Sequence, residues 1–366
     1  MLINKLPEDC LRAIFAELND LDDLINCFKV CNKWSYLMLE RTKNVKYLLK
    51  GASDASPDSV YYRGEDPIDG TLLNILFPNL IFCEFLDKFA TKVKREDIFA
   101  SLRVNNNFLS EPIYKFCDKL EMLSFDHYRP RILRNVPSLK QLHILDGSLD
   151  DFEKDALCFP NLERLHISNQ KIFEKLKIVE LSSLCTNSYH IGSFYFAYSC
   201  PNLQSAHIQV NGGEEFSDSC FKHVSMRDLV VNFTLSHFGK KQIDWKNLKL
   251  LLLKFPNLKH LKFGGKVNIR DEHIEQVVHI LPNLVLLDVS ECDGITPTAA
   301  YYVQSYCKRY GRSTKFYFNE NAHEILSDWP ELSTKIEKIS QGFDFMKNCF
   351  LKRFHDLPHI LIPTDH

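Results

Sequence analysis

The chain has 366 residues, of which 45 are basic and 47 acidic, so its formal net charge at pH 7 is −2. A balanced charge gives no overall electrostatic attraction to nucleic acid, and no run of about twenty apolar residues occurs that could span a membrane. The hydrophobic fraction of 45% is that of a globular protein with a sizeable core.

The cysteine usage favours a reducing compartment. The 12 cysteines are scattered without the spacing of a disulfide framework. Pro7, Glu8 and Asp9 interrupt the region where the apolar part of a secretory signal would lie. We therefore expect an intracellular protein, cytoplasmic or nuclear.

The first predicted element is a helix that begins at about Pro7. Proline fits the first helical position because its missing N–H group costs nothing there, and Glu8 and Asp9 complement the helix dipole. The apolar residues that follow have the helical spacing i, i+3, i+4 and i+7. They are Leu11, Ile14, Phe15 and Leu18.

Two more short helices are predicted directly afterwards. Asp20 is placed to cap a helix that contains Leu21, Leu24 and Ile25. A third apolar stripe runs from Phe28 to Leu39. A unit of about forty residues cannot bury all its apolar surface alone, so we expect it to have a partner.

These residues resemble the F-box family. Leu6-Pro7, Ile14-Phe15-x-x-Leu18, Leu21-x-x-Leu24 and Val30-Cys31-x-x-Trp34-x-x-Leu37 follow the usual order of that motif. The resemblance implies a three-helix F-box over residues 1–43 that docks the Skp adaptor and, through it, a cullin/RING ubiquitin ligase. The adaptor-binding residues that it implies are Leu6, Pro7, Leu11, Ile14, Phe15, Leu18, Leu24, Val30 and Trp34. The alternative is an ordinary helical cap on the structure that follows.

Residues 44–70 are predicted to form a linker. The stretch from Gly51 to Gly70 is rich in Gly, Ser, Asp and Pro, which favours a loop. The preceding stretch from Asn44 to Leu49 is a candidate strand.

From residue 71 to residue 318 the chain repeats one phrase, Pro-x-Leu-x-x-Leu-x-apolar. Periods of about twenty to thirty residues are typical of solenoids, and L-x-x-L-x-L resembles the leucine-rich repeat. The clearest copies begin at Pro137, Pro160, Pro201, Pro256 and Pro282. Weaker copies are anchored at Leu80, Phe99, Leu120, Met226 and Ser313.

The long interval between Leu162 and Leu203 should contain one more repeat. Leu176, Val179 and Leu181 are its candidate inward residues. With this repeat the array has about 9 to 11 copies. The predicted fold class is therefore α/β: a small three-helix F-box followed by an irregular leucine-rich-repeat solenoid, with a curved parallel sheet and with helices and loops on the convex side.

Helices are expected mainly in the C-terminal half of the array. Asp271 to Leu281 and Thr296 to Arg309 have helical apolar spacing, and Thr296-Pro297 fits a cap followed by a first-turn proline. The last copy, from Leu284 to Thr296, resembles the cysteine-containing repeats common behind F-boxes, and this resemblance implies that Cys292 points inward at the end of a strand. Residues 319–366, including the amphipathic stretch from Leu332 to Phe350, are predicted to form a helical cap and a tail that cover the last repeat. A separate binding tail is the alternative.

Few residues point to chemistry. Cys27 and Cys31 lack a second Cys or His pair at zinc spacing, and Pro358 argues against a shared helical face for His355 and His359. The chain also lacks the glycine-rich, metalloprotease and hydrolase motifs. We expect no metal, no cofactor and no catalytic activity.

The concave face of the predicted sheet is the remaining candidate site. The third and fifth residues of L-x-x-L-x-L lie on this face, and neighbouring strands are about 4.8 Å apart. His143 and His166 should therefore stand side by side and titrate as a coupled pair. The residues predicted to bind a protein substrate are His143, Arg164, His166, His207, His260, Lys262 and Asp288.

The leading hypothesis is a substrate-recognition subunit of a Skp/cullin/F-box ubiquitin ligase. Catalysis would belong to other subunits, and this chain would contribute proximity and orientation to an unknown protein substrate. A non-degradative adaptor or scaffold is the second hypothesis, and an enzyme with a site in the concave groove is the third. No nucleic acid and no membrane is expected as a partner.

Overall fold

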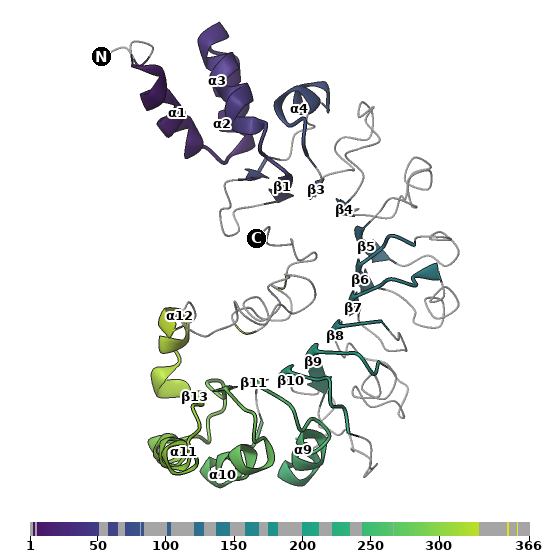
Figure 1. Ribbon diagram of the computed structural model, residues 1–366, viewed down its shortest axis with the longest axis vertical. Helices are drawn as coiled ribbons and strands as arrows, with labels where there is room; N and C mark the ends of the chain where they lie inside the picture. Colours follow the sequence, from purple (N-terminus) through teal and green to yellow (C-terminus); the bar gives the residue numbers. More distant parts are fainter. Residues whose placement is uncertain are drawn as a thin grey trace. The chain divides into compact units, whose positions relative to one another are not determined.

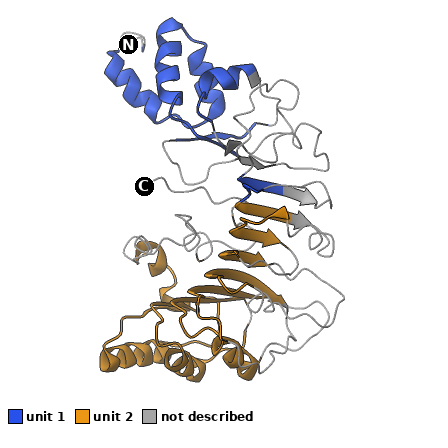
Figure 2. Cartoon of the chain, turned by 45° about the vertical axis from the view of Figure 1, so that its right-hand side comes forward, with its two compact units in different colours: residues 1–127, 131–139 blue, residues 128–130, 140–366 orange. Residues whose placement is uncertain are grey.

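The computed structural model describes residues 3, 6–50, 58–64, 70–80, 82–83, 101–103, 121–127, 137–146, 158–167, 175–181, 200–211, 222–234, 244–265, 267–328, 350 and 357. The chain divides into two compact units (Figure 2): unit 1 contains residues 1–127 and 131–139, and unit 2 contains residues 128–130 and 140–366. Within the described ranges, none of the helices combines the length and apolar character that a membrane crossing requires.

Unit 1 begins with three short helices at the predicted places (Figure 1). Pro7 is the N-cap of the first helix and not its first residue, so the helix begins at Glu8, one residue later than expected. Asp20 caps the second helix as predicted, since its side chain accepts a hydrogen bond from the backbone N–H of Asp22 at 3.0 Å. The three helices are α1 Glu8–Ala16, α2 Leu21–Phe28 and α3 Asn32–Thr42.

The rest of unit 1 contains one more described helix and a parallel sheet. The strands are ordered β5-β4-β3-β1-β2, and each neighbouring pair is parallel. The elements are β1 Tyr47–Lys50, β2 Ser59–Tyr62, α4 Gly70–Leu76, β3 Phe82–Cys83, β4 Ser101–Arg103 and β5 Met122–His127. The candidate strand after Asn44 is confirmed as β1. The linker prediction for residues 44–70 is wrong for β2, whose residues pair with β1 in register.

The helices of unit 1 share one core with its first strands and with α4. Leu11 and Leu24 of the helices belong to the same buried cluster as Leu48 of β1, Val60 of β2 and Leu76 of α4. Burying these side chains together stabilises both parts, because the helices alone have too little apolar surface to form a core. The boundary between the compact units therefore falls within the predicted repeat region and not at residue 43.

Unit 2 is an array of parallel strands in chain order. Each strand pairs with the next in a constant register, which sets Leu142, Leu165, Val179 and Ala206 side by side. All four are buried. The strands are β6 Gln141–Asp146, β7 Arg164–Ile167, β8 Ile178–Leu181, β9 Ser205–Asn211, β10 Asp228–Thr234, β11 His260–Gly265, β12 Leu286–Asp288 and β13 Lys315–Tyr317.

Strand β8 belongs to the additional repeat that we predicted from the long interval between Leu162 and Leu203. It lies between β7 and β9, and its flanking Leu176, together with Val179 and Leu181, is buried. The apolar phrase was enough to locate it, because three inward side chains at the repeat spacing define one coil of a solenoid.

Helices α9 Trp245–Leu252, α10 Asp271–Ile280 and α11 Pro297–Tyr310 lie outside the curve of β10–β13 (Figure 1). Thr296 caps α11 as predicted by accepting a hydrogen bond from Thr298 N at 3.2 Å, and the helix ends at Gly311, whose φ of 62° is left-handed. The described elements are α9 Trp245–Leu252, α10 Asp271–Ile280, α11 Pro297–Tyr310, the 3₁₀ turn η5 Asn319–Asn321 and α12 Glu324–Asp328. Apart from Phe350, the predicted amphipathic stretch from Leu332 lies outside the described residues.

Cys292 lies inward at the end of β12, as predicted. Its thiol donates to the carbonyl of Phe263 with a sulfur-to-oxygen distance of 3.7 Å. Burial raises the pKa of the thiol to about 12, so Cys292 is a neutral core residue and not a nucleophile.

Candidate functional site

The predicted adaptor-binding residues of unit 1 separate into two groups. Leu11, Phe15, Leu24 and Trp34 are buried in the core of the unit, where the rings of Phe15 and Trp34 lie edge to face with centroids 5.0 Å apart. These four side chains hold the helices together. Direct contact with a partner can therefore be expected only from the others.

The second group lies at the surface. Ile14 is 41% exposed and Val30 is 51% exposed, Pro7 is also exposed, and Leu6 and Leu18 are half-buried. Ile14 lies within α1, Pro7 is the N-cap of this helix, and Leu18 follows its end at Ala16. The sequence did not single out Ile3 and Tyr36, which are exposed apolar residues as well.

In unit 2 the predicted site residues lie in two rows across the strands. The backbone register places the third residue of every repeat beside its equivalent in the next strand, and the same holds for the fifth residue. We call this strand surface the polar face. The third-position row is Gln141, Arg164, Ile178, Ser205, Asp228, His260 and Leu286, and the fifth-position row is His143, His166, Glu180, His207, Val230, Lys262 and Asp288.

Arg164, Glu180 and His166 form a buried ionic cluster. The Arg164 and Glu180 side chains are each 1% exposed, and Arg164 Nη2 donates to both carboxylate oxygens of Glu180 at 2.8 and 2.7 Å. Burial opposes ionisation of Glu180, but the charge of Arg164 and the hydrogen bond from His166 outweigh it and lower the pKa of Glu180 to about 2. Because an ionised carboxylate can only accept, His166 Nδ1 carries the proton in its 2.6 Å contact with Glu180.

His143 and His166 stand side by side as predicted. Their ring centroids are 4.2 Å apart, and the rings are tilted by 32°. Both side chains are buried, whereas the sequence had suggested a floor open to a ligand. Their coupled titration stays a prediction.

The next strands carry a second set of polar contacts. Asp228 accepts hydrogen bonds from Ser205 Oγ at 2.5 Å and from His260 Nδ1 at 2.6 Å. Asn232 Nδ2 donates to His207 Nε2 at 2.8 Å. Burial lowers the pKa of His207 to about 3, so this imidazole is neutral at pH 7 and can accept that hydrogen bond.

Lys262 lies near the C-terminal end of the polar face, on β11 and beside Asp288 of β12. Its Nζ atom is 3.4 Å from Asp288 Oδ2 and 3.6 Å from Glu291 Oε1. The Lys262 side chain is 13% exposed and that of Glu291 is 50% exposed, so this end is more open to solvent than the Arg164 cluster.

The structure places all seven predicted residues on one strand surface, where most of them bind other polar residues such as Glu180, Asp228 and Asn232. A hydrogen-bonded network of this kind fixes the register of the strands. Whether the residues also bind a substrate stays a prediction. Glu180 is a central residue that the sequence analysis missed, although aligning Leu176, Val179 and Leu181 with the repeat would have placed it beside His166.

Among the residues that the structure describes, no group of three His, Cys, Asp or Glu side chains is arranged to hold a metal ion.

The constant register and the repeated phrase define the class of fold: the strand array is a leucine-rich-repeat-like solenoid.

Comparisons with known proteins add little to this class. No protein-family model matches the chain. No curated protein matches it either. A solved structure of a TLR13–ssRNA13 complex is similar with a TM-score of 0.30 and 17% sequence identity, over 61% of this chain and 33% of that one. The chain thus spans about a third of that protein, and a likeness of this size carries no argument about fold or function.

Proposed function

We propose that this chain is an F-box-type substrate receptor, in which α1–α3 dock a Skp adaptor and the repeat array binds a protein substrate. The observation that carries the proposal is the surface of the helices. Pro7, Ile14 and Val30 are exposed apolar residues at positions of the F-box resemblance, while the core of unit 1 already buries Leu11, Phe15, Leu24 and Trp34. Exposed apolar side chains on a small helical unit are typical of a docking surface.

The repeat array supports the second half of the proposal. Solenoids present long surfaces on which a protein partner can bind. In the proposed complex, the chain supplies binding and orientation, and the ligase that the adaptor recruits supplies the catalysis.

The decisive experiment is binding of a purified Skp adaptor to the full chain. Ile14→Asp should lower the affinity by about 100-fold or more, because burying an unpaired carboxylate in an apolar contact costs several kcal/mol. The matched control is Ala16→Asp, which adds the same charge to an exposed position on α1, about 200° around the helix from Ile14.

The proposal predicts binding by the wild type and by Ala16→Asp and its loss in Ile14→Asp. If none of the three folded chains binds the adaptor, the helices are only a cap on the sheet and the proposal fails. Equal binding by all three would place the adaptor on another surface. If the adaptor binds as predicted but no bound protein is ubiquitinated, the chain is a non-degradative adaptor.

A further inference from the structure

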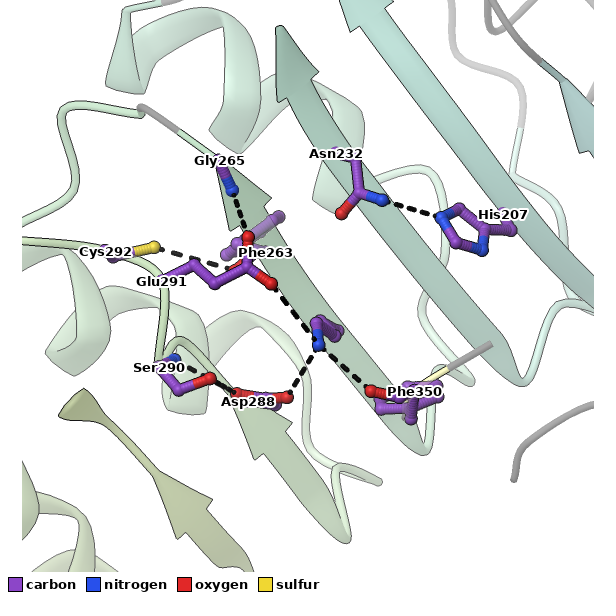
Figure 3. Close-up of polar contacts among 10 residues, drawn as sticks. His207, Asn232, Phe263, Gly265, Asp288, Ser290, Glu291, Cys292 and Phe350 are labelled. Atoms are coloured by element: carbon purple, nitrogen blue, oxygen red, sulfur yellow. Dashed lines mark hydrogen bonds and ion pairs between the residues drawn. The ribbon is translucent and has the colours of Figure 1, made fainter. Parts of the chain in front are cut away.

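A residue far beyond the last repeat reaches the polar face of unit 2. The Lys262 ammonium donates a hydrogen bond to the backbone carbonyl of Phe350 at 3.0 Å (Figure 3), across 88 positions of the sequence. Phe350 itself is only 1% exposed, and Leu357 is buried as well. The contact lies at the more solvent-accessible end of the polar face, where Lys262 and Glu291 keep some exposure.

Lys262 is held in position for this contact. Asp288 and Glu291 are both near its ammonium group, and each carboxylate is fixed by a second hydrogen bond. Ser290 Oγ donates to Asp288 Oδ1 at 2.6 Å, and the backbone N–H of Gly265 donates to Glu291 Oε2 at 2.9 Å. An ammonium group has three N–H donors, so two carboxylates can restrain it while the third donor serves a carbonyl oxygen.

The acceptor is a main-chain atom, and this has a chemical consequence. Every peptide carries backbone carbonyls, so Lys262 recognises the presence of a peptide chain and not a particular side chain. What is specific to Phe350 is its large apolar side chain, which is removed from water. We call the group formed by Lys262, Asp288 and Glu291 the seat: it binds one backbone carbonyl, and the residue that supplies this carbonyl buries a large apolar side chain.

We propose that Phe350 occupies this seat as an intramolecular ligand, which a protein partner of the repeats must displace. The partner would present a backbone carbonyl to Lys262 and a large apolar side chain in place of Phe350. This inference rests on the proposed function in one respect, namely that the repeats bind a protein. A tethered ligand has an effective concentration in the millimolar range, so it lowers the apparent affinity of any competitor for the same seat.

The test uses the full chain and a fluorescent peptide with the sequence of residues 341–360, under reducing conditions. In the wild type Phe350 fills the seat. Phe350→Asp should release this residue from the seat, because a carboxylate does not fit an apolar environment. We expect this variant to bind the peptide at least tenfold more tightly than the wild type does, as measured by fluorescence anisotropy.

Lys262 is tested in the same assay. Adding Lys262→Met to Phe350→Asp keeps the length of the side chain but removes the donor, and should weaken peptide binding about tenfold. The matched control is Lys246→Met, added to the same variant. Lys246 is an exposed lysine on α9 and should leave binding unchanged. Hydrogen exchange should also be faster at Phe350 in the single variant Lys262→Met than in the wild type.

Several outcomes would overturn the inference. Equal peptide affinity in the wild type and in a folded Phe350→Asp chain means that Phe350 does not block the seat. A variant chain that stays folded but binds no peptide means that the segment is a structural cap. If Phe350→Asp and the milder Phe350→Ala both lose the fold of the repeats, Phe350 is a core residue and the inference is equally wrong. None of these results depends on the Skp adaptor, so adaptor binding tests the proposed function independently.

Discussion

Arginine pairs with glutamate in both units, but the two pairs have different surroundings. In unit 1, Arg12 and Glu40 form an ion pair at the surface, with side chains 43% and 30% exposed. In unit 2, Arg164 and Glu180 are each 1% exposed and share their contacts with His166 and Gln141. Unit 1 keeps charge outside an apolar core, whereas unit 2 buries charge on one face of its strands.

The two units should therefore lose different amounts of stability when one side chain of the ion pair is removed. A surface pair in water contributes little, because solvent and salt screen it. A buried pair leaves an uncompensated charge when one partner is lost. The helical core of unit 1 depends on apolar volume, and the polar face of unit 2 depends on complete pairing.

The largest effect is expected from breaking the buried pair. Arg164→Met should destabilise unit 2 by about 3–5 kcal/mol, because Glu180 would remain buried without its cation. Replacing both partners, in Arg164→Met with Glu180→Leu, should recover much of the loss. Hydrogen exchange of peptides that cover β7 and β8 measures the effect within this unit. The control is Arg12→Met in unit 1, and a loss of similar size there would contradict the comparison.

In unit 1 the corresponding change removes apolar volume. Leu11→Ala should destabilise the unit by about 3 kcal/mol through lost burial and a residual cavity. Ile14→Ala, on the exposed side of the same helix, should change the stability little. Urea unfolding, followed by hydrogen exchange of the α1–α3 peptides, measures both. Equal effects of the two substitutions would mean that the helices do not share a core with β1 and α4.

Acidic pH should lower the stability of the polar face of unit 2 more than the stability of the helical core of unit 1. Since burial lowers the pKa of His207 to about 3 from its usual value of 6.5, the unfolded chain binds a proton more readily than the folded chain between these values. Stability is therefore complete above about pH 6.5 and falls as the pH decreases toward 3, by about 2 kcal/mol at pH 5. Glu180 adds a loss of the same sign below pH 4.5.

Thermal unfolding at pH 7 and pH 5 measures this contribution. The variant His207→Gln lacks the imidazole and should lose less stability on acidification than the wild type does. An equal loss in both chains would show that His207 is not the group that responds.

The smallest effects are expected from the helix caps, and these should be the same in both units. Asp20 caps α2 in unit 1, and Asp244 caps α9 in unit 2 by accepting from Asn247 N at 2.8 Å. Asp20→Ala and Asp244→Ala should each cost about 1 kcal/mol, because a cap satisfies local backbone donors whatever the core beside it. Urea unfolding checks both, and a much larger loss in one unit would mean that its cap also has a tertiary role.

Local and periodic features could be predicted from the sequence. The caps at Asp20 and Thr296 depend on short-range hydrogen bonds, and the two helices following them begin where these residues indicated. The apolar phrase located β8 within an irregular interval. It also placed His143 beside His166, because a constant repeat fixes which side chains become neighbours.

Features that depend on distant parts of the chain could not be predicted. β2 lies in a Gly- and Pro-rich stretch that resembles a loop, and it is a strand because β1 offers it a partner. From the sequence alone, the residues of the polar face are expected to be solvated, since polar side chains at alternate positions usually face water. In the folded chain most of them are buried.

What the sequence determined by itself is therefore the order of three helices and a strand array, together with the rows of side chains that a repeat must align. Those depend on spacing and on contacts close along the chain. Only the tertiary structure decided which apolar residues of α1 are buried, that Glu180 completes the Arg164 cluster, and that Lys262 meets the carbonyl of Phe350. These contacts join residues far apart in the sequence, and burial, which sets the strength of each, belongs to the folded chain as a whole.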